Sequence, residues 1–157
     1  MKKRAYSDVN FFPNRQEKLF LYEAYFDLFI KLYNKNLLSK KILLTGQVGL
    51  GKSTFAYHLI NFVLSYNENF PYDIKNYKIN PRNKSFRLIN QNCHPNFFLI
   101  DNFSDKQIID IAQIRNMITY ANHTTYRENI KFILVNNTEY LSQQSVNALL
   151  KIVEEPT

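Results

Sequence analysis

The residues best suited to chemistry in this chain are glycines, a lysine and a serine that lie close together between positions 46 and 53. They form the pattern G-x-x-x-x-G-K-S, with Gly46, Gly51, Lys52 and Ser53 at its fixed positions. Glycines let a backbone turn sharply and aim its N–H groups at phosphate oxygens. In this pattern the lysine reaches the β- and γ-phosphates, and the serine hydroxyl binds Mg²⁺. The spacing predicts a nucleotide-phosphate site.

The whole loop, and not only its fixed residues, should contact the nucleotide. We predict that ATP binds this loop and that Ser53 is the protein ligand of Mg²⁺. The chain has 3 glycines, and all of them lie here, where backbone must approach phosphate closely. An ordinary glycine-containing turn between a strand and a helix is the structural alternative. The nucleotide-binding residues that we predict are Gly46, Gln47, Val48, Gly49, Leu50, Gly51, Lys52, Ser53 and Thr54.

The segments on either side of the loop favour the nucleotide site. Ile42–Thr45 is apolar and predicts a strand, whereas the apolar spacing after Lys52 predicts a helix to about Ser65. Strand, tight loop and helix in this order form the context in which the pattern is a P-loop. The positive end of the helix dipole would then also face the phosphates.

The rest of the chain predicts an α/β fold. Residues 1–14 are polar and should be loose, residues 15–38 have the spacing of a leading helix that packs on a sheet, and residues 66–83 resemble a long surface connection. The further elements that we predict are strands at Phe86–Ile89, Phe97–Ile100 and Lys131–Val135, and helices at 108–121 and 142–153. Ser142 should cap the last helix and Pro156 should end it. Alternating strands and helices predict a parallel sheet covered by helices on both faces.

Composition restricts the class of protein. The 157 residues are 45% hydrophobic, which suits one domain with its own core. The formal net charge of +7 fits a polyanionic partner such as nucleic acid, or a solvated lysine-rich surface, and both interpretations stay open. Cys93 alone excludes an intramolecular disulfide and a four-cysteine zinc site. Because neither a membrane-spanning run nor a signal peptide is visible, we predict a cytoplasmic protein.

A second and more specific pattern lies in residues 133–157. There, residues 147–151 (NALLK) and 154–156 (EEP) match the N-A-L-L-K-x-x-E-E-P signature that follows the Walker B strand in clamp-loader ATPase subunits. His94-Pro95-Asn96 and the segment around Ile114-Arg115 resemble the H-P-D segment and the I-R helix of delta-prime subunits of the bacterial DNA polymerase III clamp loader. An ordinary amphipathic helix would explain the apolar spacing of NALLK but not the joint match.

The resemblance covers about residues 38–157 and implies a fold and a function. The implied fold is the three-layer P-loop NTPase fold of the AAA+ proteins, with residues 39–157 as its core. The implied function is that of a clamp-loader subunit in DNA replication. Such a subunit binds ATP, the other clamp-loader subunits, the sliding clamp and primer–template DNA without sequence specificity. Arg115 and surface lysines would either contact that DNA or simply face solvent.

One departure from the family concerns ATP hydrolysis. Active members end the Walker B strand in Asp-Glu, where this chain has Asn136 and Asn137. An amide is neutral and cannot act as a base, so both metal attraction and water activation are weakened. Glu139 lies beyond the expected strand end. We therefore expect ATP binding without hydrolysis, and the alternatives are a hydrolysing tau/gamma-type loader ATPase or a P-loop kinase.

A second departure concerns the end of the sequence. In AAA+ proteins further strands, a Ser-Arg-Cys motif with an arginine finger, and a helical lid follow the Walker B helix, whereas this sequence stops at Thr157. We therefore expect a partial AAA+ domain, from a truncated reading frame or a fragment of a longer subunit. The zinc module of many loader subunits is also absent, because residues 66–93 contain only Cys93.

Overall fold

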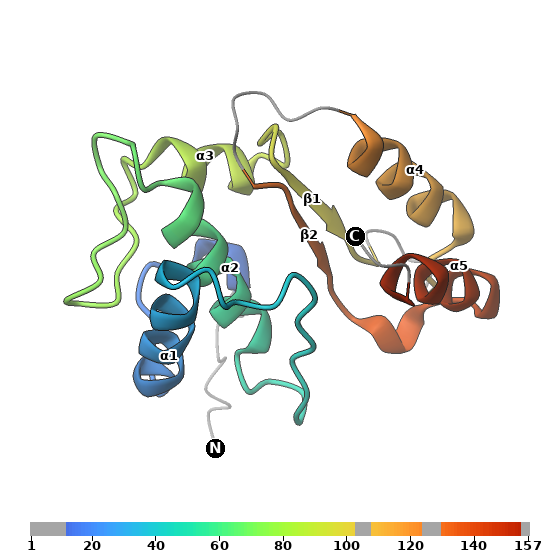
Figure 1. The fold of residues 1–157 in the computed structure, drawn as a ribbon, viewed down its shortest axis with the longest axis horizontal. Coiled ribbons are helices and arrows are strands. Elements are labelled where there is room, and N and C mark those ends of the chain that lie inside the picture. Colours follow the sequence, from blue (N-terminus) through green and yellow to red (C-terminus); the bar gives the residue numbers. More distant parts are fainter. Residues whose placement is uncertain (1–11, 103–107, 124–129, 155–157) are drawn as a thin grey trace, which may run out of the picture.

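The structure is a computed structural model that describes residues 12–102, 108–123 and 130–154. Residues 1–11 of the predicted loose N-terminus, and Pro156, lie outside these ranges. In chain order the elements are η1 (Pro13–Arg15), α1 (Glu23–Asn34), α2 (Lys52–Leu64), α3 (Lys84–Asn90), β1 (Phe97–Ile100), α4 (Ile111–Asn122), β2 (Phe132–Val135), η2 (Thr138–Tyr140) and α5 (Gln143–Glu154) (Figure 1). None of the helices within these ranges is long and apolar enough to cross a membrane.

The sheet of the described residues consists of β1 and β2, which pair in parallel. Phe97 lies opposite Phe132, and Ile100 lies opposite Val135. Parallel neighbours need a crossover connection, and α4 lies within that connection. Helices α2 and α3 lie on one side of the sheet, and α4 and α5 on the other (Figure 1). The predicted α/β class and the predicted parallel pairing are confirmed.

Alternate side chains of the strands pack on opposite faces of the sheet. Phe97 and Leu99 pack with Tyr57 and Ile60 of α2. Phe98 and Ile100 of β1 pack on the other face, where Ile100 is fully buried in a cluster with residues of α4 and α5. This two-residue period follows from strand geometry, and apolar side chains on both faces are typical of a parallel sheet.

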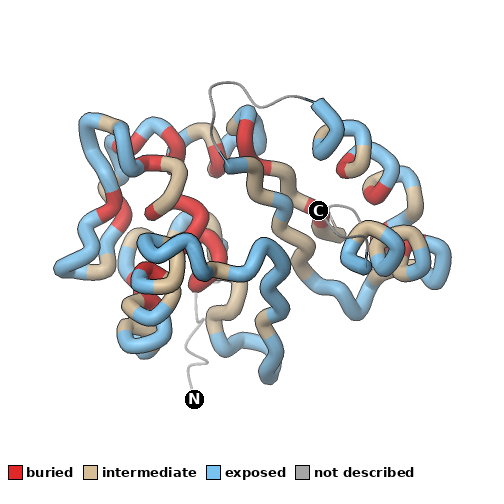
Figure 2. Tube along the Cα trace, viewed as in Figure 1, coloured by how far each residue is buried: buried red, intermediate tan, exposed pale blue. Residues whose placement is uncertain are grey.

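The largest cluster of buried aromatic rings lies away from the sheet, between α1, α2 and residues 66–83. Phe26 of α1 is fully buried, and its ring meets Phe55 and Phe62 of α2 edge-on, with centroids 5.8 and 6.3 Å apart. Tyr72 and Ile79 belong to the same cluster. Residues 66–83 are a long connection that is mostly exposed, as predicted, but Tyr72 and Ile79 anchor it in this core. The leading helix packs on α2 and not on the sheet of the described residues. Figure 2 shows the longest buried stretch along α2.

Two predicted elements differ from the structure because of contacts that local periodicity does not reveal. The leading helix spans Glu23–Asn34 only, because the backbone N–H of Leu19 donates to the carbonyl of Tyr77 (3.0 Å) and so leaves the helix. The predicted strand Phe86–Ile89 was wrong, because these residues lie in α3. The side chain of Asn83 caps that helix by accepting from the N–H of Phe86 (2.6 Å).

The predicted strand Ile42–Thr45 was also wrong. Within the described ranges these residues pair with no strand, and Leu43 is 80% exposed. A strand needs a neighbour to satisfy its N–H and C=O groups. In the described part of the chain the sheet contains β1 and β2, and residues 42–45 do not pair with either of them. Ile133, in the middle of β2, is accordingly 39% exposed.

The predicted helices that follow β1 and β2 in the chain are present as α4 and α5. Asp110 caps α4, since its carboxylate accepts from the N–H groups of Ala112 (3.0 Å) and Gln113 (3.2 Å). Ser142 caps α5, as predicted, by accepting from the N–H of Ser145 (3.2 Å). Side-chain oxygens at these positions satisfy backbone donors that have no partner inside the helix.

Candidate nucleotide site

The glycines of the motif loop have backbone angles that other residues rarely adopt. Gly49 has a φ of +86° and Gly51 a φ of +78°. A Cβ at Gly49 would meet no atom within 4 Å, and one at Gly51 would lie 3.6 Å from the ring of Tyr22. Backbone conformation, and not lack of space, therefore requires glycine at both positions. The predicted tight turn is confirmed.

The lysine of the motif is the first residue of α2 and turns back over the loop. The Lys52 ammonium donates to the carbonyl oxygens of Gly46 and Gln47, both at 2.8 Å. Two neutral carbonyls hold the ammonium less strongly than a phosphate oxygen would, because a hydrogen bond between charged partners is stronger. The ammonium therefore lies against the carbonyl groups of the loop, beside the start of α2.

The serine of the motif points at the end of β2. Its hydroxyl, Ser53 Oγ, donates to Oδ1 of Asn136 at 2.7 Å. Asn136 directly follows β2, so the end of the strand and the start of α2 meet here. The structure therefore brings together the predicted Mg²⁺ ligand and the position at which the resemblance places an acid.

Asp101 lies at this site and was missed by the sequence analysis. It directly follows β1, and parallel strands end at the same edge of a sheet. Its carboxylate accepts from Nδ2 of Asn136 (3.2 Å) and from Nδ2 of Asn137 (2.8 Å). The signal that could have identified it is an acid placed immediately after the apolar run FFLI.

Tyr22 was also missed as a contact of the loop. Its hydroxyl donates to the carbonyl of Leu50, and its ring meets the ring of Phe55 edge-on with centroids 5.9 Å apart. Tyr22 is the residue that precedes α1. The residue therefore connects the first helix to the motif loop, a contact that periodicity alone could not predict.

The rest of the predicted loop faces outward. Val48 is 92% exposed and Leu50 is 49% exposed, while Thr54 is half-buried in the first turn of α2. Within the described ranges, His, Cys, Asp and Glu form no group of three or more that could hold a metal ion. The Ser53 hydroxyl and the amide oxygen of Asn136 are hard oxygen donors that fit Mg²⁺, which usually takes its other ligands from phosphates and water.

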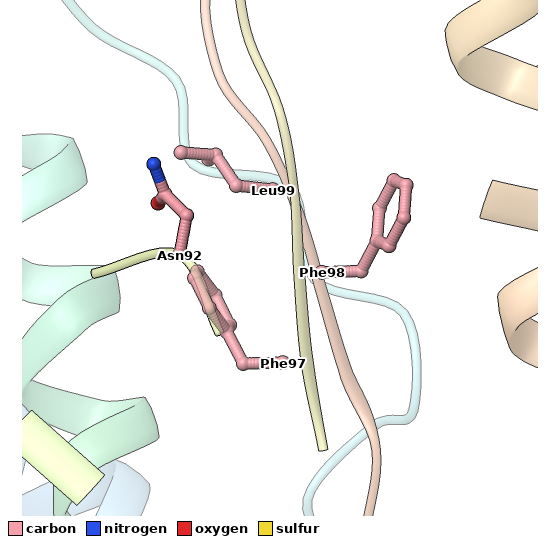
Figure 3. A pocket seen from close by; sticks show the side chains of 4 residues that line it. All are labelled: Asn92, Phe97, Phe98 and Leu99. Atoms are coloured by element: carbon pink, nitrogen blue, oxygen red, sulfur yellow. The ribbon is translucent and has the colours of Figure 1, made fainter. Parts of the chain in front are cut away.

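The hollow seen in Figure 3 is separate from the motif loop. Its volume is about 270 Å³, and Asn92, Phe97, Phe98 and Leu99 line it. Phe98 points to the opposite side of β1 from Phe97 and Leu99 (Figure 3). These are side chains of the sheet and of the turn after α3, so the hollow contributes no group to the nucleotide site.

The His-Pro-Asn segment has a structural role. Nδ1 of His94 accepts from the N–H of Asn96 (3.1 Å), and Nε2 lies 3.1 Å from the hydroxyl of Ser85 in α3. Burial lowers the pKa of His94, which keeps the ring neutral for these contacts. The segment thus holds the start of β1 against α3.

The two helices that carried the resemblance pack on one face of the sheet. Ile114 of α4 is fully buried there, while the neighbouring Arg115 is exposed. Ala148 and Leu149 of the NALLK segment pack against the same cluster. Leu150, the next residue of the segment, is 46% exposed.

The fold and the candidate site define an α/β protein in which the motif G-x-x-x-x-G-K-S leads into a helix beside the end of a parallel strand. Residues 22–157 match the family described as DNA polymerase III, delta subunit, and the chain therefore belongs to this family. The chain is also similar to DNA polymerase III subunit delta' of Pseudomonas aeruginosa, with 27% identity over 74 residues. That match covers 47% of this chain and 23% of the relative, so the matched segment spans less than a quarter of the relative's length. The predicted resemblance to delta-prime clamp-loader subunits is confirmed.

Proposed function

We propose that this chain is a clamp-loader subunit that binds ATP with Mg²⁺ and does not hydrolyse it. The observation that supports this proposal is the hydrogen bond of 2.7 Å between Ser53 and Asn136. It joins the end of the phosphate-loop motif to the residue after β2, as a nucleotide site between the two requires. The finer fold, an AAA+ nucleotide-binding core in three layers, is part of the same proposal.

Each residue of the loop would have a defined task. The N–H groups of residues 46–54 and the positive end of α2 would bind the phosphate oxygens. The ammonium of Lys52 would exchange the carbonyls of Gly46 and Gln47 for the β- and γ-phosphates. Ser53 would give its hydroxyl to Mg²⁺, which neutralises phosphate charge.

The residues after β2 argue against hydrolysis. A water that attacks the γ-phosphate needs a base or a residue that orients it. Asn136 and Asn137 are amides, and the side chain of Asn137 is already bonded to Asp101 (2.8 Å) and Asn102 (3.0 Å). We therefore propose neither a hydrolysing tau/gamma-type ATPase nor a P-loop kinase.

The partners that we propose follow from the family. They are the other clamp-loader subunits, the sliding clamp and primer–template DNA, which a replication protein would meet in the cytoplasm. The net charge of +7 is compatible with contact to DNA phosphates. Arg115, exposed on α4, is a candidate for such a contact.

The test is equilibrium binding of a fluorescent ATP analogue with Mg²⁺ to the intact protein. We expect Lys52→Ala to weaken binding about tenfold or more, because a charge-assisted hydrogen bond contributes about 1.5–3 kcal/mol. The control is Lys31→Ala, which removes an exposed lysine from α1. Equal affinity of the two variants would overturn ATP binding at this loop, and steady phosphate release by the unmodified protein would overturn the absence of hydrolysis.

A further inference from the structure

We infer that Asp101 supplies the negative charge of the Mg²⁺ site and acts through the side chain of Asn136. The inference rests on the proposed ATP site and assigns to it a residue from a neighbouring strand. Asp101 would be a positioning residue, since it acts on the metal through the amide and not by direct contact.

The first step of the argument concerns charge. Mg²⁺ is usually held by one or two carboxylates together with substrate phosphates. In this chain the loop offers the neutral hydroxyl of Ser53, and β2 is followed by two neutral amides, Asn136 and Asn137. A carboxylate from another element is therefore needed to give the site negative charge from the protein.

The second step concerns position. Ser53 Oγ lies 2.7 Å from Oδ1 of Asn136, and Nδ2 of the same amide lies 3.2 Å from Oδ2 of Asp101. One amide group thus stands between the predicted metal ligand and the carboxylate. The register of β1 and β2 produces this arrangement, because Ile100 pairs with Val135 and the two polar residues follow directly.

The third step concerns the partners of the carboxylate. Asp101 is half-buried and accepts from Asn136, from Asn137 and from the N–H of Asn102 (2.9 Å). These donors are neutral, so they orient the carboxylate without cancelling its charge. The charge of Asp101 also acts on Tyr57. Burial is the larger cause that raises the pKa of Tyr57 to about 12, and the negative charge of Asp101 adds to it.

The fourth step concerns how the charge reaches the metal. An amide that donates to a carboxylate becomes more polarised, and its oxygen becomes a better acceptor and metal ligand. Oδ1 of Asn136 is the oxygen that faces Ser53. The pair of Asp101 and Asn136 would therefore behave more like a carboxylate than an isolated asparagine does.

Other acids of the described chain fit this role less well. Glu139 lies shortly after β2 in the sequence, but it belongs to η2 and is exposed. The carboxylate of Asp110 caps α4 through two backbone N–H groups. Glu139→Gln is therefore a suitable control, because it also removes one negative charge, from the segment that follows β2.

The experiment measures how free Mg²⁺ changes the affinity of the intact protein for a fluorescent ATP analogue. We expect Mg²⁺ to strengthen binding by the unmodified protein and by Glu139→Gln. Asp101→Asn should reduce the Mg²⁺ effect about tenfold, because residues that support a metal ligand change metal affinity about 10–100-fold. In the absence of Mg²⁺ it should bind the analogue at least as well as the unmodified protein, since a negative charge near the phosphates has gone.

A double variant separates charge from shape. Asp101→Asn combined with Asn136→Asp exchanges the carboxylate and the amide between these two positions. We expect this double variant to restore the Mg²⁺ effect. A fully retained Mg²⁺ effect in Asp101→Asn, or no recovery in the double variant, would overturn the inference. ATP binding by the unmodified protein that is indifferent to Mg²⁺ would overturn the inference and the proposed Mg²⁺ ligation by Ser53, while ATP binding at the loop would stand. No ATP binding with or without metal would overturn the proposed function as well.

A measurement on the unmodified protein does not depend on the folding of any variant. With the ATP analogue present, Mn²⁺ in place of Mg²⁺ should broaden the side-chain amide NMR signals of Asn136 and Asn137. The signals of Asn36, which is exposed after α1, should stay sharp. Equal broadening of all three would overturn the assignment of the metal to this end of the sheet.

Discussion

Ser53, in the first turn of α2, donates a hydrogen bond of 2.7 Å to Asn136, which lies 83 positions further along the chain. This contact closes the site between the phosphate-loop motif and the sheet. It also stabilises this junction, because the hydroxyl and the amide, both half-buried, satisfy each other.

Asn137→Glu, which restores an acid found in active relatives, should destabilise the protein. Asn137 has a φ of +50°, where a glutamate is strained by about 1–2 kcal/mol, and the new charge would approach the carboxylate of Asp101. Urea unfolding monitored by circular dichroism would measure the loss. Asn36→Glu is the matched control, because Asn36 has a φ of +56° and is exposed like Asn137, but follows α1 and not a strand of the sheet. If both variants lose the same stability, repulsion by Asp101 plays no part.

Tyr22→Phe should weaken ATP binding while it leaves the fold almost unchanged. The substitution removes the hydroxyl that holds the carbonyl of Leu50 but keeps the ring against Phe55. One hydrogen bond contributes about 1 kcal/mol, so we expect a loss of about fivefold in affinity for the ATP analogue.

Tyr25→Phe is the control for this prediction, since Tyr25 lies nearby in α1 and is 63% exposed. Thermal unfolding of both variants should give midpoints close to that of the unmodified protein. Unchanged affinity in Tyr22→Phe would mean that the loop keeps its conformation without this contact.

Phe26→Ala should cause the largest loss of stability among the single substitutions considered. Phe26 is fully buried, and its ring meets those of Phe55, Phe62 and Tyr77 edge-on. Removal of a buried phenyl ring leaves a cavity and costs about 3–5 kcal/mol. Phe20→Ala, at a position that is 61% exposed, should change the free energy of unfolding by less than about 0.5 kcal/mol. A small effect of Phe26→Ala would show that the cluster collapses around the gap.

Stability should fall as the pH is lowered from about 6.5 towards 4. His58 is fully buried, with Nδ1 2.8 Å from the Tyr72 hydroxyl and Nε2 3.1 Å from the Gln16 carbonyl, and burial lowers its pKa to about 4. In the unfolded chain the ring titrates near 6.5. Between the two values the unfolded state binds more protons, so the stability that is present above pH 6.5 decreases as the pH falls.

Chemical unfolding at a series of pH values would test this dependence. His58→Gln should lower stability at neutral pH and flatten the profile between pH 6.5 and 4, because it removes the titrating ring. An unmodified protein whose stability is constant over this range would contradict the neutral state of His58.

The sequence by itself determined those parts of the molecule that depend on neighbours along the chain. The glycines at 49 and 51 have the positive φ angles that the motif requires, because this preference lies in the residue itself. The cap at Ser142 follows from spacing within one helical turn. The family was also evident from sequence, since residues 147–151 carry a pattern more specific than amphipathic spacing.

Only the tertiary structure decided the features that depend on distant segments. Phe86–Ile89 is helical because Asn83 caps it, while Ile42–Thr45 is not a strand because no described neighbour pairs with it. A short apolar run fits either element, so contacts outside the run decide. The sequence marks Asp101 as an acid directly after an apolar run, but only the register of β1 on β2 shows that it lies beside Asn136, because pairing across a sheet leaves no spacing in the sequence.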